Sequence, residues 1–231
     1  MNIAIILASG IGKRMQNETP KQFIVVKDKP IFLYSVLTFQ DVPEIEGIII
    51  VTNREYITTV KEYVKKYNVS KVFSVVSGGK TRQESVRCGL CEVTGHGTHF
   101  NKILIHDSAR PLVSKDIIIN NIKELDNCPA VETALKTRDT IIESIDNKTI
   151  NQVLNREKIY QAQTPQSFIY NVIRAAHAKA IEDEIEDASD DIGLVLRMNQ
   201  KVHIVEGDPL NFKITTQSDL MIFKAIVENE D

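Results

Sequence analysis

The sequence predicts an α/β protein with a Rossmann-like, doubly wound and mostly parallel sheet. Short, almost continuously apolar segments alternate with longer stretches in which apolar residues recur at helical spacing. The first pattern is typical of parallel strands that are covered on both faces, and the second is typical of helices. Their alternation favours right-handed strand–helix–strand units packed around one sheet.

Strands and helices of this kind alternate through the first half of the chain. One helix is expected at residues 54–67, and another at 114–126, where Ser114 is a candidate N-cap. Strands are expected at residues 2–8 (NIAIILA), 47–52 (GIIIVT), 71–76 (KVFSVV) and 102–107 (KILIHD).

The pattern becomes more polar after Ala130. Residues 139–156 indicate two strands joined by the polar turn 146–148, and so a hairpin arm of about residues 136–158 that projects from the sheet. Because two strands alone are marginally stable in water, the arm is either a surface excursion or an element that packs on a second subunit. The remaining elements expected are helices at 168–181 and 217–229 and a strand at 201–206.

Length and composition exclude several classes of protein. The 231 residues suit one large domain, residues 1–231, with the arm as its appendage. A formal net charge of −3 argues against a nucleic-acid partner. No apolar run approaches the roughly 18–20 residues that span a bilayer, and the N-terminus lacks the basic start of a signal peptide, so no membrane partner is expected. Three cysteines imply no disulfide framework, and a reducing, cytoplasmic location is expected.

The segment IILASGIGKRM (residues 5–15) resembles several phosphate-binding turns without matching them. Its two glycines are too close together for a P-loop, and Met15 stands where a dinucleotide fingerprint needs a small residue. Two interpretations remain. Either the glycines let the backbone approach an anion, with Arg14 and Lys21 supplying charge, or the segment is an ordinary strand-to-helix turn with solvated basic residues.

Two further strand ends carry residues suited to a ligand. SGGKTRQES (77–85) is a glycine-rich turn with basic residues, and HDSARP (106–111) places Asp107 at the end of a strand. Because ligands of open α/β sheets bind at the carboxyl ends of the strands, these segments are expected to converge on one site. Asp107 suits Mg²⁺, which is usually held by one or two carboxylates and phosphate oxygens, but it could instead cap a helix or pair with Arg110.

In this order, the motifs resemble those of the cytidylyltransferases that act on polyol phosphates. The motifs are ASGIGKRM…PKQF (8–23), GGKTRQESVRCGL (78–90), HDSARPLV (106–113), RDT (138–140), NREKIYQAQTPQSF (155–168), SDD (189–191) and VEGDPLNFKITTQSDL (205–220). The resemblance covers essentially the whole chain and is greatest to the 2-C-methyl-D-erythritol 4-phosphate cytidylyltransferases of non-mevalonate isoprenoid synthesis. It implies a fold of the nucleotide-diphospho-sugar transferase type, CTP and a polyol phosphate as substrates, and Mg²⁺ or another divalent cation as cofactor.

The resemblance also implies roles for individual residues. The implied nucleotide-binding residues are Ala8, Ser9, Gly10, Gly12, Gly78, Gly79, Arg82 and Ser85. The implied catalytic residues, which contact the triphosphate and the reacting phosphates, are Arg14, Lys21 and Lys213. The implied acceptor-binding residues are Asp107, Arg110, Thr140, Arg156, Thr164 and Ser189, with Asp107 also near the metal. In such enzymes the arm crosses a homodimer, so Thr140 and Arg156 are implied to serve the neighbour's site.

The implied reaction is attack of a phosphate monoester oxygen on the α-phosphorus of CTP, with pyrophosphate leaving. The nucleophile is already anionic, so catalysis rests on positioning and on stabilising negative charge. The acceptor is less well defined than the donor. Ile142 and Tyr160 stand where methylerythritol enzymes usually have Lys and Trp, which favours the ribitol 5-phosphate cytidylyltransferases. HDSARPLV and ESVRCGL favour methylerythritol, which we expect, with ribitol 5-phosphate as the alternative.

Three other interpretations each fit part of the sequence. Cys88, Cys91, His96 and His99 form a C-x2-C-x4-H-x2-H pattern, but the cysteines fall on a predicted helix and the histidine gap is shorter than that of zinc fingers. A non-catalytic nucleotide sensor would keep the glycine turns but would need no acceptor pocket. A sugar-nucleotide pyrophosphorylase using UTP or GTP would share the opening turn but not GGKTRQES or QTPQSF.

Overall fold

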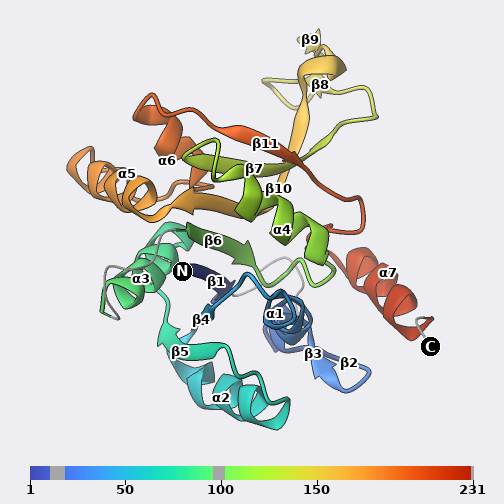
Figure 1. Ribbon diagram of the computed structural model, residues 1–231. Coiled ribbons are helices and arrows are strands. Elements are labelled where there is room, and N and C mark those ends of the chain that lie inside the picture. The colour runs from blue at the N-terminus through green and yellow to red at the C-terminus, as the bar shows by residue number, and fades with distance from the viewer. Residues whose placement is uncertain (11–18, 96–101, 230–231) are drawn as a thin grey trace.

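The computed structural model describes residues 1–10, 19–95 and 102–229, and a seven-stranded sheet lies at its centre (Figure 1). The strands of this sheet are β1 (Asn2–Ala8), β4 (Gly47–Thr52), β5 (Val72–Ser77), β6 (Lys102–Asp107), β7 (Ala130–Lys136), β10 (Tyr160–Ile169) and β11 (His203–Glu206). Their spatial order is β11-β7-β10-β6-β1-β4-β5. Only β10 runs against its two neighbours, and the other pairings within this sheet are parallel. The expected mostly parallel α/β sheet is therefore confirmed.

Helices cover both faces of the sheet. α3 (Arg82–Gly95), α5 (Tyr170–Glu182) and α6 (Ile192–Arg197) pack on one face, and α1 (Ile31–Gln40), α2 (Ile57–Lys66) and α4 (Lys115–Glu124) pack on the other. α7 (Gln217–Glu228) packs beside α1 through a separate small core. Short elements complete the described chain: η2 (Lys21–Phe23), η3 (Arg54–Tyr56), η4 (Arg156–Lys158), β2 (Val25–Val26), β3 (Lys29–Pro30), β8 (Ile142–Glu143) and β9 (Gln152–Val153). None of the helices in the described ranges is long and apolar enough to cross a membrane.

The continuous apolar runs have a simple cause. Alternate residues of a strand point to opposite faces of the sheet. In β1, Ile3 and Ile5 therefore enter the core under α3 and α5, while Ala4 and Ile6 enter the core under α1 and α4. A strand with a core on each side needs an apolar residue at nearly every position, and this requirement explains the continuous apolar runs in the sequence.

Most expected elements match the structure closely. The strands at 2–8, 47–52 and 102–107 are confirmed at these bounds, and the one expected at 71–76 lies one residue later. Ser114 caps α4, because its Oγ accepts the backbone N–H of Ile117 at 3.3 Å. The expectation that a helix begins at residue 168 is wrong, because residues 168 and 169 still pair with β6 as the end of β10.

The arm between β7 and β10 stands away from the sheet (Figure 1). Its two strands, β8 and β9, are each only two residues long, which is far shorter than the hairpin pattern suggested. Asp146 organises the turn between them, since its Oδ1 accepts the N–H of Lys148 at 2.9 Å and that of Thr149 at 2.7 Å. These hydrogen bonds lower the pKa of Asp146 to about 2.

Candidate active site

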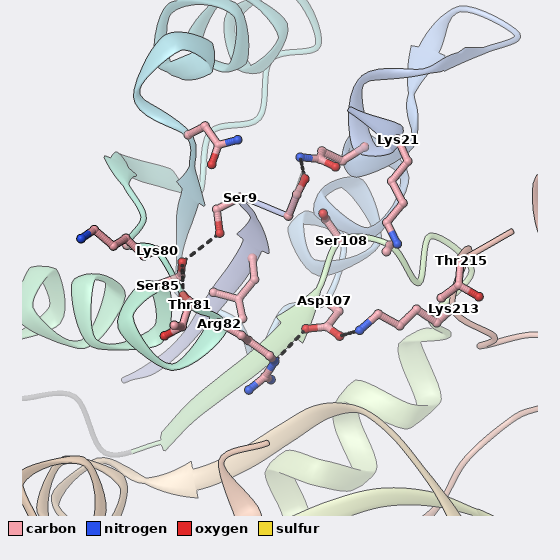
Figure 2. A pocket seen from close by; sticks show the side chains of 16 residues that line it. Ser9, Lys21, Lys80, Thr81, Arg82, Ser85, Asp107, Ser108, Lys213 and Thr215 are labelled. Carbon is pink, nitrogen blue, oxygen red and sulfur yellow. Dashed lines mark hydrogen bonds and ion pairs between the residues drawn. The ribbon is translucent and has the colours of Figure 1, made fainter. Parts of the chain in front are cut away.

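A pocket of about 650 Å³ opens at the carboxyl ends of β1, β5 and β6 (Figure 2). Of the residues expected at the site, the pocket wall includes Ser9, Gly10, Lys21, Gly79, Arg82, Ser85, Asp107 and Lys213. They come from five separate segments of the chain, so the folded sheet, and no single motif, assembles the site.

A pair of hydroxyl groups closes one end of the pocket. Ser9 Oγ, after β1, lies 2.9 Å from Ser85 Oγ, on α3, and Ser85 Oγ also donates to the carbonyl of Thr81 at 2.9 Å. Gly78 makes this approach possible. A Cβ at Gly78 would lie 2.7 Å from Ser85 Oγ and 2.9 Å from Ser9 Cβ. The glycine is therefore needed because two neighbouring chain segments pass too close for any side chain.

Gln22 holds the turn after β1, and sequence analysis did not single it out. Its side chain is 1 % exposed. Its Nε2 donates to the carbonyl of Ala8 at 2.9 Å and to that of Gly10 at 2.7 Å. The buried amide thereby fixes two carbonyls of the turn, and Ala8, whose side chain belongs to the core under α1 and α4, takes part through its backbone. The other two expected residues of the segment, Gly12 and Arg14, lie outside the described residues.

Asp107 is the centre of charge in the pocket (Figure 2). Its Oδ1 accepts a hydrogen bond from Arg82 Nε at 3.3 Å, and its Oδ2 accepts one from Lys213 Nζ at 2.7 Å. Burial alone raises the pKa of a carboxyl, but the charges of Arg82 and Lys213 outweigh it and hold the pKa of Asp107 far below its usual range. Asp107 is therefore ionised throughout the physiological range.

Arg82 lies between two carboxylates. Besides Asp107, it contacts Asp191, whose Oδ2 accepts a hydrogen bond from Arg82 Nη1 at 2.7 Å. Burial lowers the pKa of Arg82, but Asp191 and Asp107 together raise the pKa above its ordinary value. Asp191 is 1 % exposed, and its position in the acidic run 182–191 gave no sign that it would be buried.

Two of the three lysines that line the pocket, Lys21 and Lys213, are linked through the backbone of the last loop. Lys213 precedes α7, and the next residue, Ile214, donates its N–H to the carbonyl of Ala109 at 2.8 Å. The carbonyl of Ile214 in turn accepts a hydrogen bond from Lys21 Nζ at 2.6 Å. The loop is therefore tied to the turn after β6 on one side and to η2 on the other, and both lysines line the pocket.

Arg110 and Thr164 lie behind the pocket wall and support it. Arg110 Nη1 donates to the carbonyl of Asn211 at 2.8 Å, and its Nη2 donates to that of Ala162 at 3.1 Å. Thr164 Oγ1 accepts the N–H of Asp107 at 3.1 Å and lies 3.0 Å from His106 Nδ1. Burial lowers the pKa of His106 to about 4, so this imidazole is neutral at neutral pH.

The remaining expected acceptor residues are not brought to the pocket of this one chain. Ser189 is exposed before α6, and its hydroxyl lies 3.5 Å from Asp190 Oδ2. Thr140 and Arg156 are exposed on the arm, away from the sheet. The pocket of the single chain thus includes most of the described residues that we expected at the nucleotide, but only Asp107 of those that we expected at the acceptor.

The cysteine-histidine pattern does not form a metal cluster in the described part of the chain. Cys88 is half-buried on α3 and Cys91 is exposed on the same helix, while His96 and His99 lie outside the described residues. Within residues 1–10, 19–95 and 102–229, no group of three or more His, Cys, Asp or Glu side chains is placed to hold a metal.

Comparison with known proteins identifies the family. The family model of IspD, 2-C-methyl-D-erythritol 4-phosphate cytidylyltransferase, matches residues 2–229. The chain belongs to the IspD family. It is therefore a CTP-dependent cytidylyltransferase, as its motifs led us to expect.

Relatives of this IspD-family enzyme include proteins with two different names. A 2-C-methyl-D-erythritol 4-phosphate cytidylyltransferase of Clostridium novyi is 39 % identical over 229 residues, covering 99 % of this chain and 97 % of the relative. A ribitol-5-phosphate cytidylyltransferase of Vibrio parahaemolyticus is 34 % identical over 240 residues, covering 100 % and 98 %. The crystal structure of 4-diphosphocytidyl-2C-methyl-D-erythritol synthase from Anaerococcus prevotii matches with a TM-score of 0.85 at 30 % identity, covering 99 % of this chain and 96 % of that one.

Proposed function

We propose that this cytidylyltransferase transfers CMP from CTP to 2-C-methyl-D-erythritol 4-phosphate and releases pyrophosphate. The observation that carries the proposal is the cluster of Arg82, Asp107 and Lys213 in the pocket where the strand ends meet. The family match over residues 2–229 and the relative at 39 % identity support this acceptor.

CTP binds, in this proposal, with its cytosine and ribose at the end of the pocket that Ser9 and Ser85 line, beside Gly78. The Ser9–Ser85 pair offers hydroxyl groups, which both donate and accept hydrogen bonds, to the polar edges of a nucleoside. The triphosphate extends toward Lys21 and Lys213, whose ammonium groups suit phosphate oxygens. Pocket volume supports this assignment, because about 650 Å³ falls within the roughly 300–1,000 Å³ of small-molecule sites.

The reaction is an in-line exchange at the α-phosphorus. A phosphate oxygen of the acceptor forms the new bond to phosphorus, and the bond from the α-phosphorus to the bridging oxygen of pyrophosphate breaks. Charge accumulates on the α-phosphoryl oxygens and on the leaving pyrophosphate. Lys213 and Arg82 stabilise this charge, since both are held in position by Asp107 before the substrate arrives. No side chain needs to remove a proton from the nucleophile.

Asp107 is the residue that would hold Mg²⁺ or another divalent cation. Each of its oxygens accepts one hydrogen bond and keeps further lone pairs, so the carboxylate can add a metal ligand bond beside its two cationic partners. A single carboxylate with the phosphate oxygens of the nucleotide is a common environment for Mg²⁺. When bound, the ion would supply additional positive charge to the phosphates.

The protein acts as a homodimer in this proposal, with the arm of one chain on the other. Exposed apolar side chains on the arm support it. Ile145 is 79 % exposed, Val153 is 64 % exposed and Ile150 is 62 % exposed, although the arm itself has two strands of only two residues each. A second subunit would cover these side chains and would receive Thr140 and Arg156 near its acceptor. The three unpaired cysteines, Cys88, Cys91 and Cys128, suit a cytoplasmic location, where CTP is available.

The test is a comparison of initial rates of pyrophosphate release from CTP. 2-C-Methyl-D-erythritol 4-phosphate and ribitol 5-phosphate are supplied separately under the same conditions. A higher kcat/KM with methylerythritol 4-phosphate supports the proposal, and a higher value with ribitol 5-phosphate establishes the alternative that the 34 % identical relatives favour. Binding of CTP without turnover of either acceptor would overturn the proposal in favour of a nucleotide sensor.

A further inference from the structure

A buried chain of contacts leads from the pocket to α5. It begins at Arg82, which faces Asp107 in the pocket and Asp191 behind it. Asp191 is the residue that immediately precedes α6. Its second carboxylate oxygen, Oδ1, lies 2.9 Å from Nε2 of His177 on α5.

Both members of the inner contact are excluded from water. His177 is 3 % exposed and Asp191 is 1 % exposed. The backbone N–H of Asp191 donates to Gln166 Oε1 on β10 at 3.1 Å, which fixes the main chain at the same residue. Asp191 is therefore held by a helix, a strand and an arginine, and its carboxylate has little freedom to rotate.

The arrangement assigns the proton of the imidazole. His177 Nδ1 is buried and has no hydrogen-bond partner among the described residues. A proton on Nδ1 would leave a buried donor unpaired, which costs about 1–3 kcal/mol, whereas a proton on Nε2 is accepted by Asp191. The imidazole therefore donates from Nε2 to Asp191 Oδ1.

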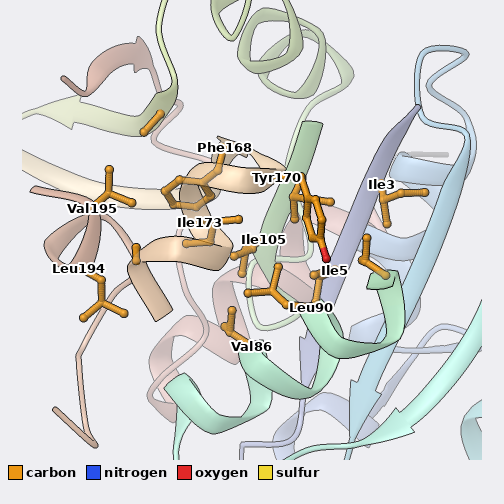
Figure 3. Packing of buried hydrophobic residues seen from close by; sticks show 14 of the residues in the cluster. Ile3, Ile5, Val86, Leu90, Ile105, Phe168, Tyr170, Ile173, Leu194 and Val195 are labelled. Atoms are coloured by element: carbon orange, nitrogen blue, oxygen red, sulfur yellow. The ribbon is translucent and has the colours of Figure 1, made fainter. Parts of the chain in front are cut away.

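The elements that carry these residues are rigidly packed. Ile173 of α5, Leu194 of α6 and Val86 of α3 belong to one core (Figure 3). α3 also carries Arg82 at its first position. Because the three helices share one close-packed core, the distance between His177 on α5 and Arg82 on α3 is fixed.

We propose that His177 is a positioning residue for Arg82 and that it acts through Asp191. With His177 donating to Oδ1, the other oxygen of Asp191 is directed at Nη1 of Arg82, and Nε is directed at Asp107. Nη2 of Arg82 has no hydrogen-bond partner in the described part of the chain and is left for a phosphate oxygen of the nucleotide. This inference rests on the proposed function only in that Arg82 is taken to contact CTP.

The experiment compares His177→Leu with His177→Gln. Leucine removes the donor within an apolar surrounding, whereas the glutamine amide can place its Nε2 near the position of the imidazole Nε2 and restore the hydrogen bond. His203→Gln is the matched control, because His203 also contacts a carboxylate, Glu124, but does so at the surface of β11. The dissociation constant of CTP is measured by calorimetry, and KM and kcat are measured for both substrates.

For His177→Leu we expect the dissociation constant and the KM of CTP to rise at least fivefold while the KM of the acceptor stays within twofold. His177→Gln and His203→Gln should both remain within twofold of the wild type in every constant. In an Asp191→Asn background, His177→Leu should raise the dissociation constant of CTP by less than a further twofold. The reason is that Asp191, through which His177 acts, has already been altered.

A purely structural histidine would give a different result. It would lower the melting temperature and the amount of active protein, which reduces the apparent kcat, but the KM and dissociation constant of CTP would stay unchanged. That outcome would overturn the inference, as would equal rises in the KM of both substrates. If His177→Leu does not fold, His177→Asn, whose shorter amide does not reach Asp191, takes its place. Failure of the proposed function can be distinguished from failure of this inference. If the wild-type protein shows no turnover, its dissociation constant for CTP can still be measured and compared with that of His177→Leu.

Discussion

Lys213 Nζ lies 2.7 Å from Asp107 Oδ2, although the two residues are 106 positions apart in the sequence. This contact joins the loop before the last helix to the end of a central strand. It holds a positive charge at the pocket in the absence of any ligand, and Arg82 holds a second on the other oxygen of the same carboxylate. Asp107 thus keeps two cations close together that would otherwise repel each other.

Removal of one of these cations should abolish most of the turnover. We expect Lys213→Ala to lower kcat by about 10²–10³-fold, which is the usual effect of losing one preorganised charge-stabilising group. The melting temperature should change little, because Lys213 is 39 % exposed and its ion pair is partly solvated. Lys224→Ala, on the exposed face of α7, is the control. Wild-type rates in Lys213→Ala would remove this lysine from the mechanism.

A methyl group at Gly78 should disturb both stability and nucleotide binding. The new Cβ would meet Ser85 Oγ at 2.7 Å and Ser9 Cβ at 2.9 Å, so the hydroxyl pair must separate. We expect Gly78→Ala to cost about 1–3 kcal/mol of unfolding free energy, as overpacking does, and to raise the KM of CTP. Gly10→Ala serves as the stability control, since a Cβ there meets no atom of the described residues within 4 Å. Equal melting temperatures for the two variants would contradict the close approach.

Glu132 should make stability depend on pH in the neutral range. Burial raises the pKa of Glu132 to about 8, with the charge of Asp190 adding to the effect and the hydrogen bond from Gln166 opposing it. The folded protein therefore keeps a proton that the unfolded chain releases near pH 4.5, so this contribution to stability is complete below that pH and is lost as the pH rises toward 8.

Glu132→Gln tests this linkage, because its amide stays neutral. We expect the variant to lose less stability than the wild type between pH 6 and 9, by on the order of 2 kcal/mol at the upper end, in urea unfolding at each pH. Glu62→Gln, on the exposed side of α2, should follow the wild type. Parallel pH profiles for wild type and Glu132→Gln would mean that Glu132 is ionised in the folded protein.

The contribution of the arm to a neighbouring site can be tested by complementation. Arg156→Ala and Lys213→Ala chains should each have little activity alone. Co-expressed, they should recover about a quarter of the wild-type rate if the proposed two-fold symmetric dimer forms, because half of such dimers are mixed and each mixed dimer has one intact site. Recovery would be absent if Arg156 acts within its own chain. Sedimentation of both variants checks that the dimer itself is preserved.

Local sequence patterns were sufficient for the parallel part of the sheet and for the strand ends that meet at the pocket. Buried strands such as 2–8 and 47–52 face a core on both sides, so their whole length is apolar and their bounds are visible in the sequence. β10 was missed because its polar first half faces neither core, and because its pairing partners, β6 and β7, are distant in the chain.

The sequence by itself determined the class of fold, the glycine-rich turns that line the pocket and, through its motifs, the family. Those properties depend on residues that lie close together in the sequence, so they can be recognised without knowing how the chain folds. The tertiary structure alone decided that Arg82 lies between Asp107 and Asp191, and that Gln22 supports the first turn. Arg82 and Asp191 are 109 residues apart, so their contact depends on which loops the sheet order and helix packing bring together.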